Sequence, residues 1–133
     1  RLRRKAREHQ AGLMVVYKTT VTAVGDLVSD FRDQGLLVFF GEQAPAELHE
    51  FSVLHRVEIS ERAPKPGDLI RINANEFNVL AVGSVVSDNL LNLGHLDLKA
   101  NGLTEAELPG DTNVEQVELP MIKVGDVIEI VSK

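Results

Sequence analysis

Cysteine and tryptophan are absent from this chain of 133 residues, and aromatic residues make up only 5% of it. Without cysteine the chain has no disulfide, no thiolate nucleophile and no cysteine-ligated zinc site. No apolar run approaches the roughly 18 residues that span a bilayer, and no segment has the apolar region of a secretory signal peptide. We therefore expect a cytoplasmic protein, and hydrophobic residues, at 44%, suffice for the core of one domain.

The charges are distributed unevenly along the chain. Residues 1–13 carry five basic side chains and one acidic one, whereas residues 14–133 carry 9 basic and 19 acidic side chains. We interpret residues 1–13 as a basic extension that is disordered or non-native. The acidic body argues against nucleic acid as a partner, because binding to phosphates requires lysine and arginine.

Strand patterns dominate residues 14–133, which we expect to form a single domain. Runs of β-branched or alternating residues bounded by Pro-Gly and Gly-Asp turns are typical of short strands. Many such strands at regular spacing favour an all-β barrel, closed or partly open. Segments 26–34 and 87–93 predict one or two short helical turns, and Ala74-Asn75 predicts a tight turn. The predicted strands are 15–24, 36–40, 51–59, 69–73, 76–86, 96–100 and 127–131.

The chain also contains an internal repeat. Four segments of the first half recur in the same order in the second half, at offsets of 58 or 60 residues. This order predicts an internal duplication, in which two copies of one unit close together into a small barrel with a pseudo-two-fold axis. The matched segments are 23–30 with 81–88, 65–72 with 123–130, 46–48 with 106–108, and 57–59 with 117–119.

His55 is the most informative residue of the chain. Side chains alternate along the predicted strand 51–59, so His55 shares one face with four apolar side chains. It is the only polar residue on that face. At an offset of 60 its counterpart in the second half is Glu115, so the repeated scaffold does not require histidine there. The residues alone are compatible with a core histidine and with a nucleophile in a water-poor site.

The other histidines carry weaker signals. His9 lies in the basic extension, His49 in a polar turn, and His95 on one face of a strand with Asp97. No His-x-His or His-Glu-x-x-His spacing is present, although His55, His95 and a carboxylate from distant strands leave a metal-dependent hydrolase open. No serine elbow and no glycine-rich phosphate loop is present either, so we expect no nucleotide cofactor.

A further set of short segments is informative through its order along the chain. The segments are 44–48, 50–51 followed by His55, 81–85, 88–90, 93–95 and 102–110. In this order they resemble the glucitol/sorbitol-specific IIA component of the bacterial phosphoenolpyruvate-dependent sugar phosphotransferase system. The resemblance covers residues 14–133.

The resemblance implies a phosphotransferase component that forms a phosphohistidine and needs no cofactor. His55 would accept phosphate from the phosphocarrier protein HPr and pass it to the IIB component of a sorbitol transporter. The protein would then meet the membrane only through the IIB and IIC components. His95 would be the supporting group. Arg56-Val57 departs from the second histidine-containing stretch of such proteins, which leaves the helper groups of His55 open.

One structural alternative remains, a non-catalytic regulatory or binding barrel in which His55 is structural. The burial of the His55 ring distinguishes the two hypotheses. A ring with both nitrogens enclosed and bonded to protein needs local opening before it can receive phosphate. The sequence does not identify the phosphorylated ring nitrogen. A homodimer formed by pairing exposed barrel edges is a further expectation.

Overall fold

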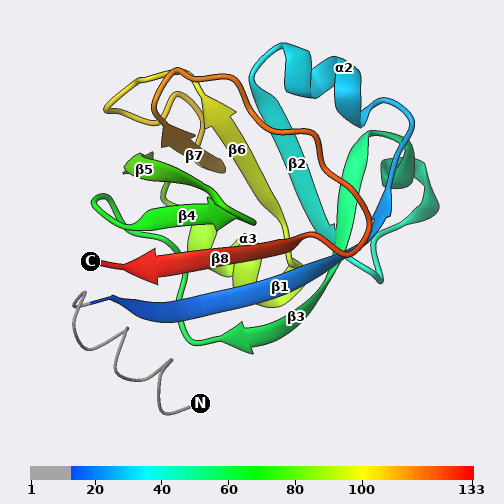
Figure 1. Ribbon diagram of the computed structural model, residues 1–133, viewed down its shortest axis with the longest axis horizontal. Coiled ribbons are helices and arrows are strands. Elements are labelled where there is room, and N and C mark those ends of the chain that lie inside the picture. Colours follow the sequence, from blue (N-terminus) through cyan, green and yellow to red (C-terminus); the bar gives the residue numbers. More distant parts are fainter. Residues whose placement is uncertain (1–12) are drawn as a thin grey trace.

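The computed structural model describes residues 13–133, in which eight strands and three short helical elements form a barrel (Figure 1). Residues 1–12 of the predicted basic extension lie outside the described residues. The strands are β1 (Met14–Val24), β2 (Leu36–Gly41), β3 (Ser52–Ser60), β4 (Leu69–Ile72), β5 (Asn75–Val82), β6 (Leu96–Ala100), β7 (Asp111–Val114) and β8 (Val127–Ser132). The helical elements are α2 (Val28–Asp33), the 3-10 helix η1 (Ala46–Phe51) and α3 (Val86–Leu93).

The barrel is closed, with the strand order β1-β3-β2-β6-β7-β5-β4-β8. The pairs β2·β3 and β6·β7 are parallel, and the other neighbours are antiparallel. The predicted all-β barrel is therefore confirmed. Closure leaves no free barrel edge among the described strands, so edge pairing does not supply a route to a homodimer.

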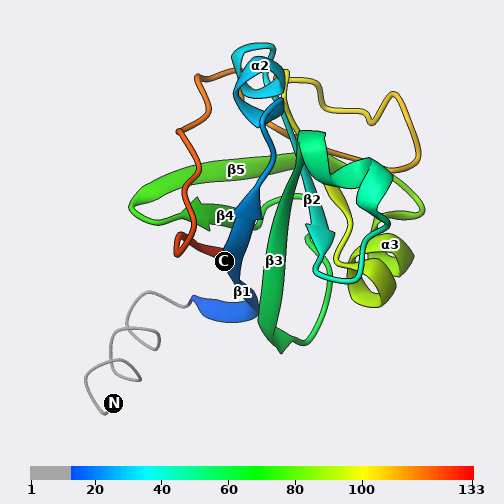
Figure 2. The ribbon, with the colours of Figure 1, turned by 90° about the vertical axis from the view of Figure 1, so that its right-hand side faces the viewer.

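Apolar side chains from the helices complete the barrel core. Val28 of α2 and Val86 and Leu90 of α3 are each at most 4% exposed. Figures 1 and 2 show α2 and α3 on different sides of the barrel. No helix in the described part of the chain is long and apolar enough to cross a membrane.

The internal repeat is visible in the strand order. Exchanging β1–β4 for β5–β8 reproduces the same ring of neighbours. Four antiparallel pairs join the halves, and two of them, β2·β6 and β4·β8, pair each strand with its own equivalent. The Gly-Asp turns repeat as well. Val21 of β1 bonds to the backbone of Gly125 and Asp126, and Val79 of β5 bonds in the same way to Gly67 and Asp68. Each half therefore supplies the turn that caps the first strand of the other.

The strand register corrects the predicted counterpart of His55. Val21 of β1 is paired with His55, and Val79 of β5 is paired with Val114, so the counterpart is Val114 and not Glu115. The offset of 60 came partly from residues 117–119, which lie outside β7. A shift of one residue exchanges the two faces of a strand. Val114 is fully buried, so an apolar side chain suffices at this position in the second half.

Two elements, one strand end and one turn differ from the sequence predictions. The predicted strand 76–86 ends at Val82, because residues 83–85 turn the chain into α3, which begins at Val86. The strand β7 and the helix η1 were not predicted, and the tight turn lies at Asn73 and Ala74, one residue earlier than expected. The strand β7 reads Asp-Thr-Asn-Val, and aspartate and asparagine are rare in strands. All four residues are buried, and Lys99 donates to the Asp111 carboxylate at 2.9 Å. Long-range pairing therefore overrides the weak local preference.

Two equivalent glycines allow close backbone packing in the two halves. A Cβ atom at Gly25 would overlap the carbonyl oxygens of His49 and Glu50, and one at Gly83 would overlap that of Pro109. We expect Gly25→Ala and Gly83→Ala each to lower the free energy of unfolding by about 1–3 kcal/mol, the usual cost of overpacking. Urea unfolding measures the change.

The matched control is Gly110→Ala, because a Cβ atom there meets its nearest neighbour only at 3.7 Å. This variant should change the free energy of unfolding by less than about 1 kcal/mol. Equal stability of all three variants and the wild type would contradict the close packing at Gly25 and Gly83.

Candidate functional site

The His55 ring lies in the wall of the barrel and is only 2% exposed. Its Nε2 atom lies 2.6 Å from the carbonyl oxygen of Gly94, and its Nδ1 atom lies 2.5 Å from the Thr19 hydroxyl. The edge of the ring meets Phe39 in a T-shaped contact, with 6.1 Å between ring centroids. Both ring nitrogens are thus enclosed and bonded to protein. The ring can therefore accept phosphate only after the surrounding structure opens locally.

The two hydrogen bonds define the protonation of the ring. A carbonyl oxygen can only accept, so Nε2 of His55 carries the hydrogen and donates it to Gly94. In the neutral ring Nδ1 then accepts a hydrogen bond from the Thr19 hydroxyl. Burial lowers the pKa of His55 below its ordinary value. The bond to Gly94 and the nearby Glu42 carboxylate raise the pKa, but their effect is smaller. The ring is therefore held neutral, the form in which an imidazole is nucleophilic.

Gly94 can reach His55 because it is a glycine in a left-handed conformation. It follows the last residue of α3 with φ +64°, the usual way to end a helix. A Cβ atom at this position would lie 2.7 Å from the nitrogen of Gly41 and 3.1 Å from Nε2 of His55. The absence of a side chain thus allows the α3–β6 turn to close over the ring.

His55 separates an outer groove from the barrel interior. The groove, of about 350 Å³, is lined by the C-terminal part of α3, by residues 41–43 after β2, and by Arg56 and Val57 of β3. On the inner side is a small cavity of about 10 Å³ with a largely aliphatic wall. Tyr17, His55 and Leu90 line both spaces. A displacement of the Gly94 carbonyl would therefore open Nε2 toward the groove.

The structure places His95 next to this turn but directs its ring elsewhere. Its Nε2 atom lies 3.0 Å from the Asp97 carboxylate, and its ring stacks on Phe40 with 4.1 Å between centroids. It makes no hydrogen bond to His55 among the described residues. The carbonyl of Gly94, the residue before His95, bonds to the His55 ring, and a supporting role for His95 stays a prediction.

The structure describes one of the two remaining histidines, His49. His49 bonds to the carbonyl oxygen of Ala44 at 2.8 Å, and His9 lies outside the described residues. Within residues 13–133 no three histidine, aspartate or glutamate side chains are grouped as metal ligands. The structure therefore does not bring His55, His95 and a carboxylate together as a metal site.

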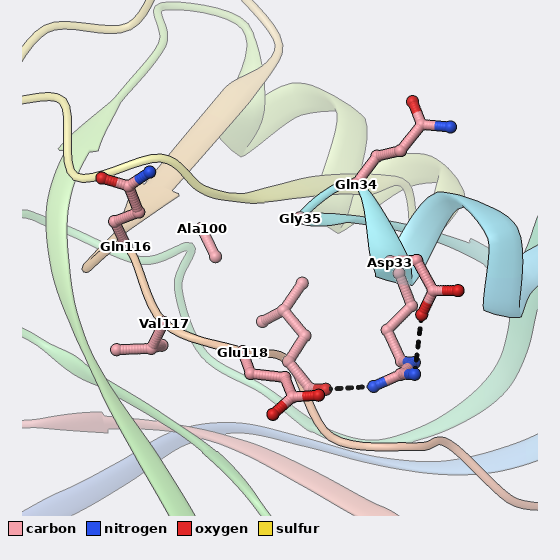
Figure 3. A pocket seen from close by; sticks show the side chains of 9 residues that line it. Asp33, Gln34, Gly35, Ala100, Gln116, Val117 and Glu118 are labelled. Atoms are coloured by element: carbon pink, nitrogen blue, oxygen red, sulfur yellow. Dashed lines mark hydrogen bonds and ion pairs between the residues drawn. The ribbon is translucent and has the colours of Figure 1, made fainter.

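A second, larger hollow of about 510 Å³ lies between the end of α2 and residues 116–119 (Figure 3). Arg32 donates to the carbonyl oxygen of Leu119 at 2.7 Å and pairs with Asp33 at 2.7 Å. Its guanidinium group thus fastens the segment before β8 to α2. We assign this hollow a structural role.

Sequence reasoning missed the groups that hold the His55 ring. Thr19 is indistinguishable in the sequence from the other β-branched residues of its strand. Gly94 lies in segment 93–95, one of those that carry the family resemblance, but its carbonyl bond to His55 depends on the packing of α3.

Comparison with known proteins confirms the resemblance seen in the sequence. Residues 16–129 match the sequence model of the family described as PTS system glucitol/sorbitol-specific IIA component. The chain is 37% identical over 120 residues to the glucitol/sorbitol-specific EIIA components of Shigella flexneri and of Escherichia coli K12. Both alignments cover 90% of this chain and 98% of the relative.

A solved structure has the same fold. The crystal structure of a PTS system IIA component from Enterococcus faecalis V583 matches with a TM-score of 0.72 at 23% identity, over 84% of this chain and 96% of that one. The sequence relatives and this shared fold place the chain among the IIA components of the phosphotransferase system. Within that class it belongs to the glucitol/sorbitol-specific family.

The enclosed His55 ring generates a prediction about pH. Because its pKa is lowered by folding, the unfolded chain binds this proton first as the pH falls. The stability contributed by the neutral ring is complete above the unfolded pKa of about 6.5 and is lost as the pH falls below it. Below pH of about 6.5, the free energy of unfolding of the wild type should fall relative to that of His55→Gln by at most about 1.4 kcal/mol per pH unit.

Urea unfolding at pH values between about 5 and 8 measures this difference. NMR titration of the His55 ring supplies the control, with a pKa below the ordinary value and the hydrogen on Nε2. A His55 pKa at or above the ordinary value would show that the ring is solvated and would contradict the described site.

Proposed function

We propose that this protein is a cytoplasmic phosphoryl carrier of a glucitol/sorbitol phosphotransferase system. His55 accepts the phosphoryl group from phospho-HPr and passes it to the IIB component, which supports uptake and phosphorylation of the sugar. One observation carries the proposal: a neutral imidazole whose Nε2 is separated from an outer groove by a single backbone carbonyl, that of Gly94.

The geometry favours Nε2 of His55 as the accepting atom. Nδ1 faces Thr19, which is 2% exposed and lines the inner cavity, whereas Gly94 lines the outer groove. A displacement of the α3–β6 turn would therefore expose Nε2 and leave the bond to Thr19 in place. When the turn closes, it limits the access of water to the site, which protects a labile phosphohistidine from hydrolysis.

The transfer requires a change of tautomer. Once the Gly94 carbonyl is displaced, Nε2 loses its hydrogen to water and Nδ1 takes one from water, which it donates to the Thr19 hydroxyl. The Nε2 lone pair then attacks the phosphorus of phospho-HPr, and the electron pair of the broken N–P bond returns to the histidine of HPr. Positioning dominates such reactions. In the second transfer the acceptor on IIB attacks, and the electron pair returns to Nε2 of His55.

The rim of the groove suits short-lived contacts with two partners. Val57, Leu91 and Leu93 are between 39% and 56% exposed there. Arg56 and Glu42 form an exposed ion pair at 3.1 Å beside them. A small apolar centre with a charged edge is typical of transient interfaces, which bind weakly and release quickly.

A second candidate function is a non-catalytic barrel in which His55 is structural. The observation in its favour is that both ring nitrogens already have protein partners. Against a purely structural need stands Val114, which fills the equivalent position of the second half without any polar group.

Incubation with phosphoenolpyruvate, enzyme I and HPr tests the proposal. We expect intact mass spectrometry to show one acid-labile phosphoryl group on the wild type and none on His55→Ala, because this variant lacks the accepting nitrogen. Gly94→Ala should be phosphorylated at least about tenfold more slowly, because its methyl group would lie 3.1 Å from Nε2.

His49→Ala is the matched control and should be phosphorylated like the wild type. His95→Ala tests which of the two histidines beside the turn is phosphorylated. We expect this variant still to carry the phosphoryl group on His55. A phosphoryl group that persists in His55→Ala and disappears in His95→Ala would transfer the assignment to His95. A wild type that takes up no phosphoryl group would favour the non-catalytic barrel.

A further inference from the structure

The hydroxyl of Tyr17 is buried without a hydrogen-bond partner. Tyr17 lies on β1, is 2% exposed, and its oxygen meets no donor or acceptor among residues 13–133. A buried hydroxyl left unpaired destabilises the folded state, and most such groups find a partner. The unpaired Tyr17 hydroxyl lies in the wall between the inner cavity and the outer groove, and this position suggests a functional explanation.

The position of Tyr17 supplies that explanation. Together with His55 and Leu90 it lines both the inner cavity and the outer groove. The two polar groups that contact the ring nitrogens are already engaged, since Thr19 bonds to Nδ1 and the carbonyl of Gly94 bonds to Nε2. Arg56, the basic side chain that lines the groove, is paired with Glu42 and its side chain is 70% exposed. Tyr17 is thus a buried donor in this wall that has no partner among residues 13–133.

We propose that the Tyr17 hydroxyl donates a hydrogen bond to an oxygen of the phosphoryl group carried by His55. This inference rests on the proposed function and adds a residue to it. A phosphoryl group on Nε2 brings negative charge beside the buried part of this wall, where a prearranged donor is worth more than in water. The bond forms once the Gly94 carbonyl has moved away from Nε2.

The chemistry of the tyrosine suits a donor and not an acid. Burial raises the pKa of Tyr17 to about 12, so the O–H group stays intact at neutral pH. No proton is transferred and no bond of the tyrosine breaks. The hydroxyl stabilises charge on the phosphoryl oxygens, both while the N–P bond forms and while the phosphohistidine waits for its acceptor.

The decisive variant is Tyr17→Phe, which removes the hydroxyl and keeps the ring. Phosphoramidate, a small phosphoryl donor, loads His55 without a partner protein, so docking does not affect the result. We expect Tyr17→Phe to be phosphorylated at least about tenfold more slowly than the wild type, and to lose its phosphoryl group at least about tenfold faster after the donor is removed. Phosphorus NMR follows both rates.

The matched control is Thr112→Val. Thr112 is fully buried and its hydroxyl also lacks a partner, but it lies on β7 in the second half of the barrel. This variant should load and lose the phosphoryl group at the wild-type rates. Both variants should be at least as stable as the wild type toward urea, because each loses only an unpaired polar group.

A second measurement does not depend on the variants. Tyr17 is the only tyrosine of the chain, so fluorotyrosine labels this one site. The fluorine NMR signal of the full chain should shift when His55 is phosphorylated, and it should not shift in His55→Ala treated in the same way.

The outcomes separate the inference from the proposed function. Wild-type rates in Tyr17→Phe, or a fluorine signal unchanged by phosphorylation, would overturn the role of Tyr17 and leave His55 as acceptor. A wild type that takes no phosphoryl group on His55 would overturn both. Slower loading and faster loss in Tyr17→Phe alone, with Thr112→Val unchanged, would support the inference.

Discussion

The bond between Nε2 of His55 and the carbonyl oxygen of Gly94 is the interaction on which the site depends. It selects the tautomer of the ring, and it joins the end of α3 to the barrel wall. It also separates the ring nitrogen Nε2 from the outer groove. Because the donor is neutral and the bond is buried, its strength is modest against water but its loss without replacement is costly. In the proposed function the turn at Gly94 therefore acts as a gate, and contacts with a partner favour its open state.

The two polar side chains that meet at the site, Thr19 and His55, occur in only one half of the duplicated scaffold, whereas the Gly94 carbonyl and α3 come from the other half. Thr19 is paired with Ile128 across β1 and β8, and Phe77 has the same relation to Ile70 across β4 and β5. The polar pair of Thr19 and His55 is therefore replaced in the second half by Phe77 and Val114. Both replacements are buried, so the second half retains the packing and lacks the chemistry. The duplication thus provides the shape, and two polar substitutions provide the site.

Most strands and the duplication could be predicted because alternation and Gly-Asp turns are local signals. The polar strand β7 could not, because its pairing depends on residues far away in the chain. His55 was recognisable as the polar member of an apolar row, and its role as acceptor stays a prediction. Its surroundings were not predictable, since Thr19 and Gly94 meet it across separations of 36 and 39 residues. The counterpart in the second half was predicted one residue too late, because part of the alignment came from a segment outside the strand.

The pairing of β1 with β8 has a consequence for how the chain folds. The first strand of the barrel remains without one neighbour until the last has been synthesised, so most of the chain leaves the ribosome before the ring can close. Contacts between distant segments make folding slow and leave strand edges exposed in the meantime. The interlocked turns between the halves extend this dependence, because β5 needs residues 67–68 and β1 needs residues 125–126. Folding of this barrel is therefore a late, cooperative event of the whole chain, and neither half can complete it alone.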